Sequence, residues 1–272
     1  MRRYTIFYLI HVNILELTID ELLKGKATII RNKEYFSTES YVVPFLERMS
    51  KFTNDFRIQA KLPDQISITK KEDLNLEDTV FNRVWIQAVM PEEYSFNNHQ
   101  EVIGLVYGLD TRKPVVKIYR GALNMACLNL CVFNPSFLNI QELEPEKAID
   151  FRCIQPLMEQ TSDIKARLDK LADTELSYDE EVINRNLGLW VRNALKVSYD
   201  TGCGKVKLAA STAIDAYKLI YEDEESPYFT PKGTTTDMFN VYNAWTQIIT
   251  DDKKDIMNKA EKTILVSKIL GI

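Results

Sequence analysis

Five cations stand close together between Ile183 and Leu208, and residues of this type could bind phosphate groups. Only Asp200 opposes them, so this stretch has a net charge of +4 in a chain whose total is −5. In a helix the first three would lie on one side, because they are spaced by seven and then four residues. Such a row could follow a nucleic-acid backbone, and ordinary solvated surface is the alternative. The five cations are Arg185, Arg192, Lys196, Lys205 and Lys207.

A second basic cluster lies on a predicted β-hairpin and comprises Arg112, Lys113, Lys117 and Arg120. If the two clusters meet in one groove, binding of single-stranded DNA is the leading hypothesis. An exposed aromatic side chain in the first stretch could stack on bases. Trp190, however, falls on the apolar stripe of its predicted helix, so we expect it in the core.

Acidic residues dominate the neighbouring stretch 169–181, whose net charge is −5. Its densest part is formed by Asp179, Glu180 and Glu181. A surface of this kind can dock onto a basic partner. The second hypothesis is therefore a protein-binding module that inhibits a host defence or another host factor. Acidic residues also favour solubility and the N-termini of helices, which is the simpler interpretation.

Motifs of the common enzyme classes are missing from the sequence. It has no phosphate-binding glycine loop, dinucleotide-binding turn, zinc-protease helix or serine-hydrolase elbow. The two histidines are His11, predicted in a buried strand, and His99, predicted in a polar loop. We therefore expect no catalytic residues, no metal and no cofactor. Carboxylates are plentiful but are not set in apolar strands, so a metal-dependent nuclease is the weakest hypothesis.

Cysteine content and hydropathy predict a soluble, cytoplasmic protein. Four cysteines in 272 residues are too few for a secreted disulfide framework. The apolar run from Thr5 to Ile10 is interrupted by His11 and Asn13 and has no cleavage site after it, so it predicts a strand. No run of about eighteen apolar residues occurs, which argues against a membrane partner. Whether the protein forms a homo-oligomer stays open.

The elements that must position these residues separate into two halves. With 45% hydrophobic residues, the 272-residue chain is long enough for one domain with a sizeable core. Strand patterns dominate residues 1–147, and a hairpin is predicted from 102–109 and 115–119. A capping box at Thr18 and Glu21 predicts a short helix there, and 40–51 suggests another.

Helical periodicity takes over in residues 148–272. It predicts helices at 164–171, 182–198, 207–221, 238–249 and 253–270. The apolar stretch 121–133 fits either a buried helix or a strand. The sequence thus predicts an α+β fold, in which a β-rich N-terminal half packs with a helical C-terminal half.

Two stretches share motifs with a known family. Gly104-Leu105 and Cys127-Leu-Asn129 occupy the places of a Gly-Leu strand and a Cys-x-Asn-Gly signature, with Leu130 in place of the glycine and Asp110-Thr111 in place of the usual turn. Tyr242, Asn243, Ala244 and Thr246 match a Tyr-Asn-Ala-x-Thr helix. In these features the chain resembles a phage- and plasmid-borne family of unknown function.

The resemblance would extend over roughly residues 35–270 and implies a mobile-element protein in a bacterial host cell. It implies no reaction. Asn129 and Asn243 lie beside apolar residues, so we expect them to fix the fold through hydrogen bonds. The leading hypothesis is a non-enzymatic accessory protein that binds single-stranded DNA during recombination or replication.

Overall fold

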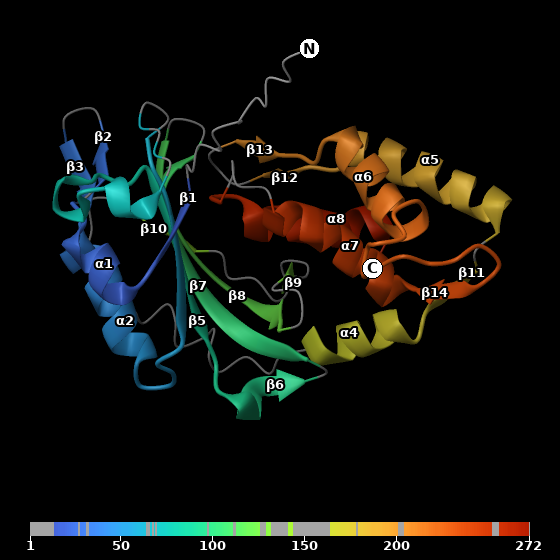
Figure 1. Cartoon of the computed structure of the whole chain (residues 1–272), viewed down its shortest axis with the longest axis horizontal. Coiled ribbons are helices and arrows are strands. Elements are labelled where there is room, and N and C mark those ends of the chain that lie inside the picture. Colours follow the sequence, from blue (N-terminus) through green and yellow to red (C-terminus); the bar gives the residue numbers. More distant parts are fainter. Residues whose placement is uncertain are drawn as a thin grey trace, which may run out of the picture.

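The computed structural model of the chain combines a curved antiparallel sheet with a set of helices (Figure 1). The sheet comes from the N-terminal half and the helices that follow it come from the C-terminal half, so the predicted α+β class is confirmed. The structure describes residues 14–26, 28–30, 33–63, 66, 68, 70–96, 98–110, 113–125, 129–131, 141–143, 164–177, 179–200, 204–251 and 256–271.

A long hairpin is the centre of the sheet. Strand β7 (His99–Asp110) pairs with β8 (Lys113–Asn124) over its whole length, from His99↔Asn124 to Asp110↔Lys113. The strand order is β1 (Ile14–Leu17), β4 (Phe56–Lys61), β5 (Arg83–Val89), β7, β8 and β10 (Gln141–Leu143). Short strands β6 (Ser95–Phe96) and β9 (Leu130–Cys131) pair with β7 and β8. The predicted hairpin is confirmed, and it is longer than expected.

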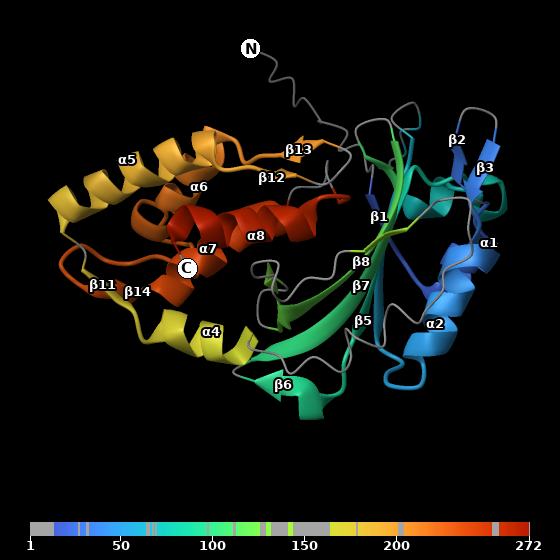
Figure 2. The same ribbon diagram turned by 180° about the vertical axis from the view of Figure 1, so that it is seen from behind.

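One face of the sheet is apolar and is covered by N-terminal helices. Helix α1 (Ile19–Lys24) begins with the predicted capping box, in which Glu21 N–H donates to Thr18 Oγ1 and Thr18 N–H donates to Glu21 Oε2. A π-helical turn (Thr38–Val42) leads into α2 (Val43–Met49). Alternate residues of β4, β5, β7 and β8 pack on these helices because side chains alternate between the two faces of a strand. Hairpin β2 (Thr28–Ile30) and β3 (Lys33–Phe36) lies in the same part (Figure 2).

The opposite face of the sheet receives helix α8 (Lys259–Leu270) along β7 and β8. Ala260 and Ile264 pack there against Trp85, Val106 and other strand residues whose side chains point to this face. Gly104 is essential to this surface, because a Cβ on it would lie 2.0 Å from Cζ of Tyr119. Because Gly104 has no side chain, the Tyr119 ring can lie over it on this face of the sheet. There the Tyr119 hydroxyl accepts hydrogen bonds from Trp85 Nε1 and Gln87 Nε2.

The remaining helices that the structure describes pack against one another and against α8. They are α4 (Ile164–Ala172), α5 (Glu180–Lys196), α6 (Ala210–Tyr221) and α7 (Met238–Asp251), joined by the two-stranded pairs β11 (Glu175–Ser177) with β14 (Thr235–Asp237) and β12 (Tyr199–Asp200) with β13 (Lys205–Val206). Trp190 is 4% exposed and meets Trp245 edge to face, with 6.0 Å between ring centroids. The prediction that Trp190 belongs to the core is confirmed. No helix in the described ranges is long and apolar enough to cross a bilayer.

Two local predictions need correction or completion. His99 is fully buried in β7 with its ring against Phe239, so the predicted loop position is wrong. The stretch after Gly121 continues β8 and then forms β9, which decides for strand where residues are described. His11 lies outside the described residues.

The two asparagines expected to fix the fold do so. Asn129 Nδ2 donates to Tyr228 Oη and to the carbonyl of Asn243, each at 3.0 Å. Asn243 Nδ2 donates to the carbonyl of Phe239 at 2.9 Å. The bond from Asn129 to Asn243 holds the start of β9 against α7, since buried amides need partners.

Candidate functional site

The hairpin cations do not form the phosphate-facing cluster that the sequence predicts. Lys117 is 1% exposed and Arg120 is 8% exposed. Arg120 donates to the Glu101 carboxylate, with Nε 3.0 Å from Oε2. Lys113 is exposed at the start of β8, and Arg112 lies outside the described residues. The prediction is therefore wrong for Lys117 and Arg120, because carboxylates of the fold already neutralise both.

Lys117 is the centre of a buried charge cluster with Asp110, Asn258 and Glu261. Its Nζ lies 2.6 Å from Glu261 Oε1, 3.3 Å from Asp110 Oδ2 and 3.2 Å from Asn258 Oδ1. Asn258 Nδ2 donates to Asp110 Oδ1 at 3.1 Å. The buried charge cluster thus joins the end of the β7–β8 hairpin to the start of α8.

Two carboxylates share one ammonium in the buried charge cluster, so its net charge is −1 when every group is ionised. Burial raises the pKa of the Glu261 carboxyl, more than the nearby Lys117 lowers it. Glu261 Oε2 is buried without a hydrogen-bond partner. For Lys117, burial lowers the pKa, but the carboxylates of Glu261 and Asp110 outweigh it and the pKa is raised. Both shifts follow from an excess of negative charge in a dry site.

The other predicted cations form an exposed row, which we call the basic strip. It consists of Arg185, Arg192 and Lys196 on α5 together with Lys205 and Lys207 on and after β13. All five are exposed, and none forms an ion pair within the described part of the chain. Helix α5 and the β12–β13 pair follow one another along the same edge of the molecule (Figure 1).

Exposed apolar surface lies among the cations of α5. Leu189 is 40% exposed and stands four residues after Arg185 and three before Arg192, so the three share one helix face. Together with Asn186 and Gly188 they line a shallow hollow of about 420 Å³. The buried face of α5 carries Ile183, Trp190 and Ala194. This amphipathic pattern fixes which way the cations point.

The acidic residues singled out by the sequence lie at the start of the same helix. Asp179 and Glu181 are exposed, and Asp179 Oδ1 accepts the backbone N–H of Glu181 at 2.8 Å. Nothing is described of the Glu180 side chain. Acidic groups stabilise a helix N-terminus through the macrodipole, which accounts for the position of these residues.

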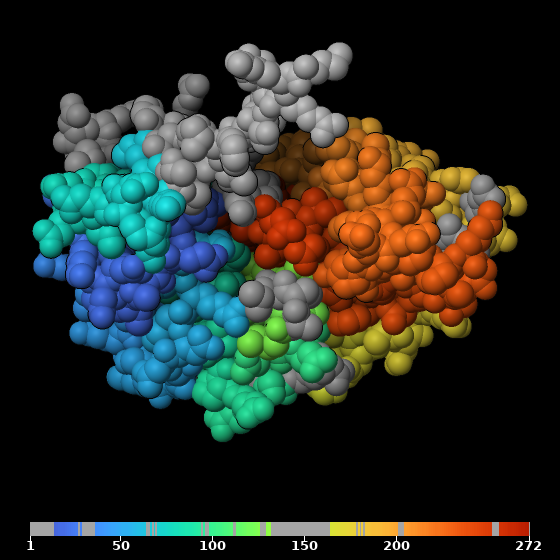
Figure 3. Space-filling view, in the orientation of Figure 1, coloured from blue at the N-terminus to red at the C-terminus, as the bar shows by residue number. Residues whose placement is uncertain are grey.

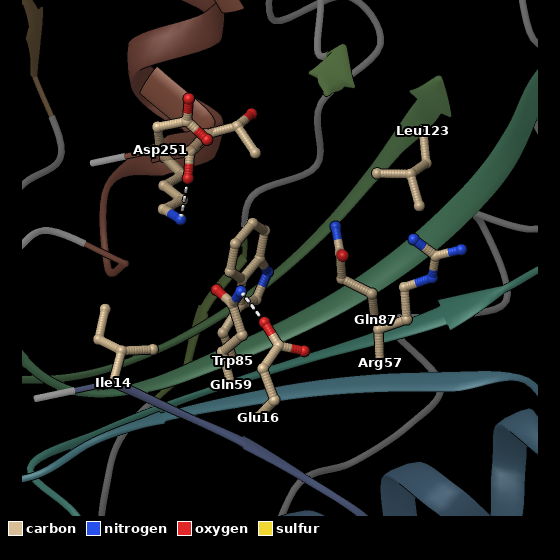
Figure 4. Close-up of a pocket in the computed structure, with 10 residues that line it drawn as sticks. Ile14, Glu16, Arg57, Gln59, Trp85, Gln87, Leu123 and Asp251 are labelled. Carbon is tan, nitrogen blue, oxygen red and sulfur yellow. Dashed lines mark hydrogen bonds between the residues drawn. The ribbon is translucent and has the colours of Figure 1, made fainter. Parts of the chain in front are cut away.

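A cavity that the sequence does not predict lies between the sheet and the ends of α7 and α8 (Figure 4). We call it the sheet cavity; its volume is about 330 Å³. Strands β1, β4, β5 and β8 and the two helices contribute its lining: Ile14, Glu16, Arg57, Gln59, Trp85, Gln87, Leu123, Thr250, Asp251 and Lys259. In Figure 3 the atoms of α8, in red, lie between the blue-to-green N-terminal part and the orange helices.

The register of the strands brings the polar side chains of the sheet cavity together. Gln59 pairs with Glu16 on one side and with Trp85 on the other. Gln59 Nε2 donates to Glu16 Oε1 at 2.8 Å, while Gln59 Oε1 is buried and accepts no hydrogen bond. Arg57 pairs with Gln87 two positions along. Polar residues at alternate positions of β4 were the only sequence signal, and that pattern equally predicts a solvated strand face.

The helices complete the sheet cavity from above. Lys259 Nζ donates to the carbonyl of Thr250 at 2.7 Å and lies 4.8 Å from the centroid of the Trp85 ring. Asp251 Oδ2 accepts from Gln247 Nε2 at 2.8 Å. Within the described residues, no three His, Cys, Asp or Glu side chains are grouped to hold a metal ion.

Comparison of the chain with protein-family models, curated proteins and solved structures finds no match.

Proposed function

We propose that the protein binds single-stranded nucleic acid along the basic strip. The observation that carries the proposal is the exposure of all five cations on one edge, without a described carboxylate paired to any of them. Cations in such a row bind phosphates by releasing counterions, independently of sequence. The mobile-element role implied by the family resemblance suits a protein that handles DNA strands in the cytoplasm of a bacterial host. The proposal involves no catalytic residue.

The strip alone must supply the affinity, because Lys117 and Arg120 are buried in ion pairs. Exposed Leu189 lies between Arg185 and Arg192 and offers an apolar contact to an unstacked base. The whole chain has a net charge of −5, so the residues outside 183–208 sum to −9 and keep the protein from coating DNA nonspecifically.

Fluorescence anisotropy with a labelled single-stranded oligonucleotide tests the proposal. For five phosphate contacts, the slope of log K against log salt is expected to be about −3.5, so affinity falls roughly a hundredfold between about 50 and 200 mM salt. The triple variant Arg185→Ala, Arg192→Ala, Lys196→Ala should reduce that slope to about −1.4.

The matched control removes three exposed cations of the N-terminal half, Lys24, Lys51 and Lys70, and should leave the slope unchanged. Absence of binding at low salt contradicts the proposal. So does a triple variant on α5 that binds with the wild-type slope.

A further inference from the structure

The sheet cavity has a composition unlike that of the basic strip. Two carboxamides, a guanidinium and an indole project from the sheet toward Asp251 (Figure 4), and Lys259 also lines the cavity. Its volume of about 330 Å³ is within the range of sites for small organic ligands. The opposite face of β4 and β5, which carry these four side chains, is apolar and packs on α1 and α2, so the polar face is not needed to build the core.

Formal charge in the sheet cavity sums to zero. Arg57 and Lys259 are balanced by Glu16 and Asp251. Lys259 is 2% exposed, and its ammonium is occupied by the Thr250 carbonyl and the Trp85 ring. A phosphate would meet two carboxylates there, so the cavity suits an uncharged ligand.

Unused hydrogen-bonding groups define what that ligand must offer. Gln59 Oε1 is buried with no donor, although Gln59 Nε2 is held by Glu16. Gln87 is 6% exposed and uses its Nε2 on the Tyr119 hydroxyl. Arg57 makes no ion pair within the described ranges. Acceptors and donors side by side match the edge of a nucleobase, which presents both.

The remaining walls are apolar, as a planar ring requires. Ile14, Trp85 and Leu123 supply them. Tyr199 of β12 packs on the same apolar cluster as Trp85 and Leu123, which connects the sheet cavity to the end of the basic strip. From these contacts we propose that the sheet cavity binds an uncharged nucleobase, presented either as a free nucleoside or as one base of a bound strand. The second source rests on the proposed function.

Nuclear magnetic resonance of the indole N–H groups tests this site directly. The chain has three tryptophans, and Trp85, which lines the site, donates its Nε1–H to the Tyr119 hydroxyl. Titration with adenosine, cytidine, guanosine and thymidine should shift that signal to saturation with at least one nucleoside, at concentrations up to about 10 mM. D-ribose, which lacks the base, should not shift it. No saturable shift with any nucleoside, or an equal shift with D-ribose, overturns the proposal.

Variants locate the binding. Gln87→Leu should weaken nucleoside binding by roughly tenfold, because a hydrogen-bonding partner is lost. Gln59→Leu should weaken it similarly and leaves the Tyr119 contacts intact, so a folding defect in the first variant does not spoil the test. Gln100→Leu is the matched control, since Gln100 is half-buried on β7 outside the cavity. Unchanged affinity in both cavity variants overturns the assignment.

Oligonucleotide binding then separates the two sources. If the base belongs to a bound strand, Gln59→Leu lowers oligonucleotide affinity and leaves the salt slope unchanged. If the ligand is a free nucleoside, oligonucleotide affinity stays at the wild-type level. The nucleoside titration needs no strand, so it can succeed when the basic strip binds nothing and fail when the strip binds DNA.

Discussion

The two basic clusters of this chain contain the same residue types and have opposite environments. On the β7–β8 hairpin, Lys117 and Arg120 are buried and paired with carboxylates. On α5, Arg185 and Arg192 are exposed and unpaired within the described residues. The difference arises because the hairpin is covered on both faces, whereas a surface helix keeps one face in water. A cluster of cations therefore indicates binding only where one face of its element stays uncovered.

Lys117→Met is the change that separates the clusters most strongly. It leaves the buried carboxylates of Asp110 and Glu261 without their cation, which should lower the free energy of unfolding by about 3–5 kcal/mol. Urea denaturation measures the loss. Recovery of stability in the double variant Lys117→Met, Glu261→Gln is the expected control, and a single variant of wild-type stability would show that the pairing is unimportant.

Gly104→Ala should have the next largest effect. The new Cβ would meet the ring of Tyr119 at 2.0 Å, and overpacking of this kind costs about 1–3 kcal/mol. Gly188→Ala on α5 should have the opposite effect. A Cβ at Gly188 would have no atom within 4 Å, and the higher helix propensity of alanine should raise the free energy of unfolding by about 1 kcal/mol. Thermal unfolding of both variants checks the pair, and a shift of the same sign in both would contradict this explanation.

The buried charge cluster should also make stability depend on pH. Because the pKa of Glu261 is raised above 4.5 in the folded state, folding takes up a proton there. Its contribution is fully present below pH 4.5 and is lost as pH rises through the folded pKa. Glu261→Gln, which stays neutral, should therefore gain stability relative to the wild type from acid to neutral pH.

Denaturation curves over that range measure the gain. Glu224→Gln, an exposed position in the loop after α6, serves as the control and should follow the wild type. If the stabilities of wild type and Glu261→Gln change in parallel with pH, Glu261 does not cause the pH dependence.

Arg192→Met is the smallest change and the direct counterpart of Lys117→Met. An exposed cation without a partner contributes little to folding, so the free energy of unfolding should stay within about 0.5 kcal/mol of wild type. The same variant should reduce the salt slope of oligonucleotide binding by about 0.7. A large loss of stability would place Arg192 in the fold rather than at a binding surface.

Local patterns in the sequence predict local structure well in this chain. The capping box at Thr18, the hairpin and the apolar stripe of α5 depend on neighbouring residues alone, and all three are confirmed. The buried position of His99 is not predictable from its neighbours in the sequence, because Phe239, which covers it, is distant in the chain. The burial of Lys117 is not predictable for the same reason, since its partner Glu261 is 144 residues away.

The sheet cavity could not be predicted because no single segment contains it. Arg57 and Gln59 alternate with apolar residues as any half-solvated strand does. Only the curvature of the sheet and the arrival of Asp251 and Lys259 turn that face into a concave site. Pairing between strands decides which polar residues meet, and the alternation within one strand does not say which distant strand lies beside it.

The 144 residues between Lys117 and Glu261 also set an order of events during synthesis. At ribosomal rates of about 5–20 residues per second, roughly 7–30 s pass between the two residues. During that interval the hairpin ammonium has no α8 carboxylate and must remain hydrated, so the face of β7 and β8 that receives α8 stays open to water. Helix α8, the last helix that the structure describes, is therefore the element that closes the sheet, and nascent chains stalled before residue 261 should bind chaperones through that face.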